Sequence, residues 1–175
     1  MKNIIKPIIA LFALFVVSCS VEDIQDRPVI EAGDAPVLTA PTDGATYVLS
    51  PENSEKQVER FTWKSSNYGG AVEVTYAVQV DLKDAKFANA ITIGSAVSQN
   101  QVSVTQAVLN TAALALGATP FSPVQMEVRV QSTLGTTSPL LSNVITIVVT
   151  PYTTEAPKIA DILFEPPIAP QPLFG

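Results

Sequence analysis

The sequence predicts an all-β fold: an antiparallel β-sandwich of the immunoglobulin-like or fibronectin III-like kind, with about seven strands and one short crossover helix. Apolar and polar residues alternate through residues 72–82, 124–131 and 145–149, which is the period of a strand with one wet face. Turn-forming clusters, such as residues 41–44 and 67–70, separate these segments. Several short strands divided by such turns are typical of a sandwich.

The longest strand signal covers residues 72–82, where every even position is apolar. Its odd positions include Glu73, Gln79 and Asp81, so one face is expected to meet solvent. Four shorter segments also have a β-branched and aromatic content that suits a half-buried pleated surface. These shorter strands are expected at Val37-Leu38, Phe61-Thr62-Trp63, Ala90–Ile93 and Val102–Val104.

One helix interrupts the strand pattern. Asn110 is a good N-cap residue, and Leu109 and Leu114 have the spacing of a hydrophobic staple. Gly117 can end the helix in the left-handed conformation. We therefore predict a short helical crossover at residues 111–116.

The first eighteen residues have the pattern of an export signal. Lys2 and Lys6 precede an unbroken apolar run, Ile8–Val17. A ten-residue helix is about 15 Å long, roughly half the hydrocarbon thickness of a bilayer, so a stable membrane span is not expected. We predict that residues 1–18 are a lipoprotein signal peptide.

The end of this signal resembles a bacterial lipobox, formed by Val16, Val17, Ser18 and Cys19. Cleavage before Cys19 would leave it as the first residue, acylated on its sulfur and on its amine. Because each buried methylene contributes about 0.8 kcal/mol, two or three acyl chains hold a protein on a membrane. The other interpretation makes Cys19 a buried thiol in a signal peptide that is cut elsewhere.

The segments on either side of the sandwich have different compositions. Residues 19–35 carry five acidic residues against Arg27 alone, which predicts a flexible acidic tether. Residues 20–23 are similar to the acidic signal that sends some lipoproteins to the cell surface, although a solvated linker has the same composition. Residues 153–175 contain five prolines, which predicts a disordered tail.

Composition excludes several classes of function. The 175-residue chain has no histidine and one cysteine, so multi-cysteine and histidine metal sites are not expected. A formal charge of −6 argues against nucleic acid. Two groups of carboxylates lie close together in sequence and suggest catalytic pairs, and the first of them also suggests a calcium site, but interleaved lysine and arginine favour solvated loops. These groups are Asp81 with Asp84, and Glu52, Glu55 and Glu59. We predict no enzyme activity and no cofactor.

The aromatic residues fall into two sets. Trp63, with Phe61 two residues before it, is expected to pack across the core, and Tyr76 lies among valines. Four further aromatics lie near loops or strand ends, where a ring is able to stack on a sugar, but they are too dispersed for a platform. They are Tyr47, Tyr68, Phe87 and Tyr152.

An ordered set of motifs through residues 36–152 resembles the N-terminal domain of the SusE family. The matching residues are Leu38, Pro41-Thr42-Asp43-Gly44, Phe61-Thr62-Trp63, Val74-Thr75-Tyr76-Ala77-Val78-Gln79-Val80-Asp81, Phe87, Leu109-Asn110, Leu116-Gly117, Val128-Arg129-Val130, Ser142-Asn143 and Val149-Thr150-Pro151-Tyr152. The resemblance implies an outer-membrane lipoprotein that works beside a TonB-dependent transporter and a SusD-like partner at the cell surface. In that family the immunoglobulin-like domain is a spacer, and C-terminal domains bind starch or other polysaccharide.

Two functions from different classes therefore remain open. The first is an accessory lipoprotein of a polysaccharide-uptake system, with residues 36–152 as spacer or docking module. The second is an immunoglobulin-like structural or adhesion lipoprotein whose partner is a protein. No position matches a motif that would assign a glycan-binding residue.

Overall fold

The computed structural model describes residues 31–135 and 139–154. The predicted signal peptide, the lipobox, Cys19, most of the tether and nearly all of the predicted tail lie outside these residues. The elements are β1 (Val37–Ala40), β2 (Ala45–Val48), the 3₁₀ turn η2 (Pro51–Asn53), β3 (Gln57–Lys64), β4 (Thr75–Leu82), β5 (Ile91–Val97), β6 (Gln101–Thr105), α2 (Gln106–Ala115), β7 (Val124–Thr133), β8 (Leu140–Leu141) and β9 (Ile145–Thr150).

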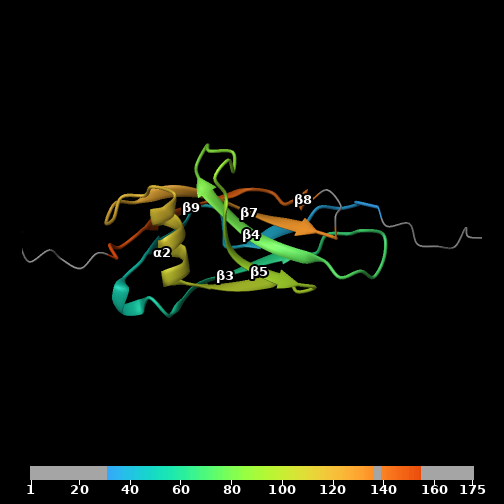
Figure 1. Cartoon of the computed structure of the whole chain (residues 1–175), viewed down its shortest axis with the longest axis horizontal. Coiled ribbons are helices and arrows are strands. Elements are labelled where there is room, and N and C mark those ends of the chain that lie inside the picture. The colour runs from blue at the N-terminus through green and yellow to red at the C-terminus, as the bar shows by residue number, and fades with distance from the viewer. Residues whose placement is uncertain (1–30, 136–138, 155–175) are drawn as a thin grey trace, which may run out of the picture.

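The strands form two sheets that face each other (Figure 1). The smaller sheet has the order β1-β3-β6, and the larger has the order β2-β9-β7-β4-β5, with β8 paired to β7. The predicted all-β sandwich with one short α-helix is confirmed. The described residues contain two strands more than the seven expected, because β2 and β8 are too short to show a period. The β2–β9 pair is parallel, whereas the other pairs are antiparallel.

The alternation in the sequence puts one face of each long strand into the core. Val78, Val80, Val128 and Val130 are fully buried between the sheets. Phe61 and Trp63 enter from the smaller sheet, and Trp63 contacts the ring of Tyr76 with 5.4 Å between centroids. The expectation that Trp63 and Tyr76 are core residues is confirmed.

The helix is longer than predicted and begins earlier. Its N-cap is Thr105, whose hydroxyl accepts a hydrogen bond from the Val108 amide at 3.4 Å. The prediction that Asn110 is the N-cap was wrong, and with it the staple of Leu109 and Leu114. Asn110 lies in the second turn of α2 and is 1% exposed. Gly117 follows the helix with φ +93°, as its sequence position suggested.

The described chain enters and leaves the sandwich at opposite ends (Figure 1). At one end, Gly33 donates its amide to the Asn67 carbonyl at 2.9 Å, so the first described residues lie beside the loop between β3 and β4. At the other end, Tyr152 pairs with Asn110 of α2. We call these the pocket end and the helix end. Strand β7 has ten residues, so at ~3.3 Å per residue the two ends are about 30 Å apart.

Candidate functional site

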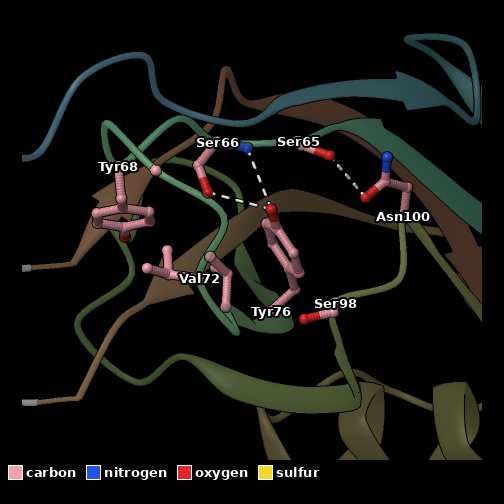
Figure 2. A pocket seen from close by; sticks show the side chains of 9 residues that line it. Ser65, Ser66, Tyr68, Val72, Tyr76, Ser98 and Asn100 are labelled. Carbon is pink, nitrogen blue, oxygen red and sulfur yellow. Dashed lines mark hydrogen bonds between the residues drawn. The ribbon is translucent and has the colours of Figure 1, made fainter. Parts of the chain in front are cut away.

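A polar hollow opens at the pocket end, between the loop that leads into β4 and the turn that joins β5 to β6 (Figure 2). Its volume is about 200 Å³. A shallower hollow of about 490 Å³ adjoins it and shares three of its residues, Ser65, Ser98 and Asn100. The two hollows form one continuous site, which we call the polar pocket.

Hydrogen bonds within the wall hold the polar pocket in shape (Figure 2). The Tyr76 hydroxyl accepts a bond from the Ser66 amide at 3.1 Å and pairs with the Ser66 hydroxyl at 3.1 Å. Across the opening, the Ser65 hydroxyl donates to Asn100 Oδ1 at 3.0 Å. The loop and the β5–β6 turn are therefore tied together by side chains as well as by the sheets.

The β5–β6 turn is also fixed through its backbone. Ser98 adopts φ +50°, an unusual conformation for a residue other than glycine, and its amide donates to the Val74 carbonyl at 2.8 Å. The carbonyl of Asn100 accepts the amide of Trp63 at 3.1 Å. Within the described chain, Ser98 Oγ and Asn100 Nδ2 make no hydrogen bond, so a rigid turn presents two free polar groups.

Tyr68 and Tyr76, which line the polar pocket, were expected near a loop and in the core, but the sequence did not single out Ser65, Ser98 or Asn100. Residues 98–101 read Ser-Gln-Asn-Gln, a run of hydroxyl and amide side chains without a charge between two strands. Such a run differs from the usual charged surface turn, and it is the signal that would have drawn attention to this place. Val72 and Val74 were expected at the start of a strand, but β4 begins at Thr75 and both valines line the hollow.

The aromatics that the sequence places near loops or strand ends have other roles in the structure. Tyr68 is 1% exposed, and its hydroxyl bonds to Ser132. Tyr152 is buried beside Asn110. Phe87 is covered by the guanidinium of Arg129, 4.0 Å from the ring centroid, which is a cation–π contact. Tyr68 and Tyr152 are thus buried, although Tyr68 also lines the polar pocket, and one face of the Phe87 ring is covered by Arg129.

The expectation of solvated carboxylates was wrong for Asp81. This side chain is 1% exposed. It accepts hydrogen bonds from the backbone amides of Leu82 at 2.7 Å and Asn89 at 2.9 Å, because the strand turns immediately after it and brings these donors to it. Asp84, by contrast, is exposed, as expected. Among the described residues no group of three or more His, Cys, Asp or Glu side chains is placed to hold a metal ion.

The second carboxylate group is also separated. Glu52 and Glu55 are exposed, as expected, whereas Glu59 is half-buried and accepts a hydrogen bond from the Tyr47 hydroxyl at 2.6 Å. Burial raises the pKa of the Tyr47 hydroxyl above its ordinary value, and the hydrogen bond to Glu59 and the charge of Glu59 raise it further. The Tyr47–Glu59 pair fixes β2 against β3.

A groove of different chemistry runs between β5 and α2. It has a volume of about 310 Å³ and is lined mainly by apolar side chains, among them Ile91, Ile93, Val108 and Ala112. Val108 is 41% exposed. No helix within residues 31–135 and 139–154 has the length and apolar character needed to cross a membrane.

These features define a class of protein: a β-sandwich module with a polar pocket and an apolar groove on its surface, and with buried aromatics in its core. The family model described as SusE outer membrane protein matches residues 23–131, more than half of the chain. The chain therefore belongs to the SusE family, and it is an outer-membrane component of a Sus system. The match ends within β7, whereas the sheet continues to Thr150. No curated protein matches the chain.

Proposed function

We propose that this protein is a non-enzymatic, lipid-anchored accessory of an outer-membrane polysaccharide-uptake system, in which residues 36–152 act as a spacer or docking module. Membership of the SusE family supports the association with a Sus system. The observation that carries the spacer role is the exit of the two chain ends at opposite ends of the sandwich, about 30 Å apart. A module of this shape holds whatever follows it away from whatever precedes it.

The anchor in this proposal is Cys19, released by cleavage after Ser18. Glu31 lies 12 residues after Cys19, and a chain of this length spans at most about 40 Å when it is fully extended. The pocket end, where Glu31 and Gly33 enter, is then the end closer to the membrane. Acidic residues in the tether support display on the outer surface, because they are similar to a surface-export signal.

The proposed protein partners are a TonB-dependent transporter and a SusD-like protein. The acylated chain, isolated from the outer membrane with mild cross-linking, is expected to bring down both partners.

The anchor is tested separately. Mass spectrometry is expected to show two or three acyl chains on Cys19. Cys19→Ser is expected to leave the outer-membrane fraction, whereas Ser20→Ala stays in it. An unmodified Cys19 in the membrane fraction contradicts the anchor, and recovery of another protein without a transporter favours the structural or adhesion role.

Surface display needs a separate test. Protease added to intact cells is expected to remove the sandwich from the cell envelope, while a periplasmic protein in the same cells stays whole. If the sandwich is protected until the cells are broken, it faces the periplasm and the surface role is wrong.

A further inference from the structure

The groove between β5 and α2, which we call the apolar groove, leaves apolar surface uncovered in the described part of the chain. No charged side chain lines it, and its only polar lining residues are Thr92 and Thr111. Val108, on its helical side, is 41% exposed. Contiguous exposed apolar surface is typical of an interaction site.

One wall of the apolar groove is an edge of the larger sheet. Strand β5 is the last in the order β2-β9-β7-β4-β5, so among the described strands only β4 pairs with it. Residues 91–93, at the start of β5, line the groove. A free edge offers backbone groups to an added strand, and apolar surface beside it accepts alternate side chains of that strand. The groove therefore fits an extended apolar segment.

The chain carries such a segment a few residues after the sandwich, outside the described residues. Residues 158–165 read Lys-Ile-Ala-Asp-Ile-Leu-Phe-Glu and contain no proline. The alternate positions Ala160, Ile162 and Phe164 are all apolar, whereas the positions between them include Asp161. This is the sequence pattern of a strand with one dry face.

The tail starts within reach of the apolar groove. Tyr152 bonds to Asn110 of α2, and the next helical residue, Thr111, lines the groove. Three strand spacings separate β9 from β5, about 14 Å in all, whereas the six residues from Thr154 to Ala160 extend to about 20 Å. Because the tail is joined to the sandwich beside the groove, its local concentration there is high, which favours it over a second chain.

We propose that residues 159–164 of this chain occupy the apolar groove as an added strand along β5, with Ala160, Ile162 and Phe164 turned into it. The segment then covers Val108 and closes an edge that otherwise invites pairing with another chain. The disorder predicted for residues 153–175 is limited to the parts before and after this segment. The contact needs neither the lipid anchor nor a transporter, so its failure and that of the proposed function are independent.

The first test is disulfide trapping in the full chain with Cys19→Ser, which removes the natural thiol. Thr111→Cys with Ile162→Cys is compared with Val48→Cys with Ile162→Cys. Both partner positions are exposed and close to the start of the tail, since Val48 pairs with Thr150. A disulfide needs Cα atoms within about 7 Å, so we expect the Thr111 pair to close within one chain about tenfold faster than the Val48 pair.

Non-reducing gels and the masses of linked peptides measure these rates. The proposal is wrong if the two pairs close equally fast, because an undocked tail reaches both positions. It is also wrong if the Thr111 pair does not close, or if it links two chains, which would make a second copy the occupant.

The second test asks which face of the segment enters the groove. Ile162→Asp puts a charge on the dry face, and the matched control Leu163→Asp puts the same charge on the other face. Hydrogen exchange of the amides of residues 91–93 is expected to become about tenfold faster with Ile162→Asp and to stay unchanged with Leu163→Asp. No change with Ile162→Asp, or an equal change with both variants, contradicts the added strand.

Discussion

Two asparagines, one at each end of the sandwich, have opposite roles. Asn110 at the helix end is 1% exposed, and its side chain bonds to both the amide and the carbonyl of Tyr152, at 2.8 and 3.2 Å. Asn100 at the pocket end is exposed, and its Nδ2 group has no partner among the described residues. The same side chain closes the structure in one place and is exposed to solvent in the other.

Burial makes the difference between the two ends. A polar group without water must be paired within the protein, so the helix end uses its buried polar side chains to hold backbone. Asp81 follows the same rule, with both carboxylate oxygens engaged by amides near the helix end. At the pocket end, Ser98 and Asn100 are exposed, and an unpaired donor on them costs little because water reaches it.

The largest effect is expected beneath the polar pocket, where buried rings support its wall. Trp63→Ala removes a side chain that is 3% exposed and packs on Tyr76, and the cavity should lower the free energy of unfolding by about 3–5 kcal/mol. Denaturant unfolding followed by circular dichroism measures this change. An unchanged midpoint would mean that the indole faces solvent and needs to be reconsidered as a sugar contact.

The matched variant Trp63→Phe should cost clearly less than Trp63→Ala. Trp63 Nε1 is buried and has no hydrogen-bond partner within the described residues. Replacing the indole by phenylalanine keeps most of the ring contact and removes this unpaired donor, which partly offsets the lost volume. An equal loss of unfolding free energy in Trp63→Phe and Trp63→Ala would show that packing of the second indole ring accounts for most of the contribution of Trp63.

The pair of asparagines gives the next largest effect. Asn110→Ala leaves the amide and carbonyl of Tyr152 without their partners, and should lower the free energy of unfolding by about 2–3 kcal/mol. Asn100→Ala should change it by no more than about 0.5 kcal/mol, because the side chain is exposed. Thermal and denaturant unfolding of both variants tests the contrast, and similar losses at the two positions would contradict it.

A third contrast compares two aspartates. Asp81→Asn replaces one of the two accepting oxygens by a donor that opposes a backbone amide, and should cost about 1–2 kcal/mol. Asp84→Asn should be within about 0.5 kcal/mol of the natural sequence, because Asn tolerates the φ of +65° found there. Urea midpoints of the two variants measure the difference. If Asp81→Asn is as stable as the natural sequence, water replaces the hydrogen bonds that Asp81 makes.

The smallest effect concerns alkaline pH. The pKa of Tyr47 is raised in the folded state, so the unfolded state ionises first, near pH 10. Stability that is present below that pH is lost as pH rises through the folded-state pKa. Tyr47→Phe should therefore show a shallower loss of stability above pH 10 than the natural sequence. If the unfolding free energy falls equally with pH in the two proteins, the alkaline loss of stability does not come from Tyr47.

Much of the fold was predictable because the long strands have one wet face and one dry face. The alternation through β4, β7 and β9 places their valines correctly in the core. The helix start was not predictable from local preference, since Thr105 and Asn110 are both good capping residues. Packing decides between them, because Asn110 in the second turn reaches Tyr152 across 42 positions of sequence.

The candidate site was much harder to predict than the fold. Its parts come from the loop before β4 and the turn before β6, and nothing local in either segment shows that they meet. Asp81 was misjudged for a related reason. A carboxylate among lysines resembles a solvated turn, and its burial depends on the amides of Leu82 and Asn89 folding back onto it.

The parallel pairing of β2 with β9 has a consequence for biogenesis. Ala45 pairs with Ile147, 102 positions later, so the larger sheet is not complete until almost the whole described chain is available. Contacts between such distant residues slow the search for the native state. With the export signal predicted for residues 1–18, this delay is useful, because the translocation channel then receives a polypeptide that has not yet collapsed into its final form.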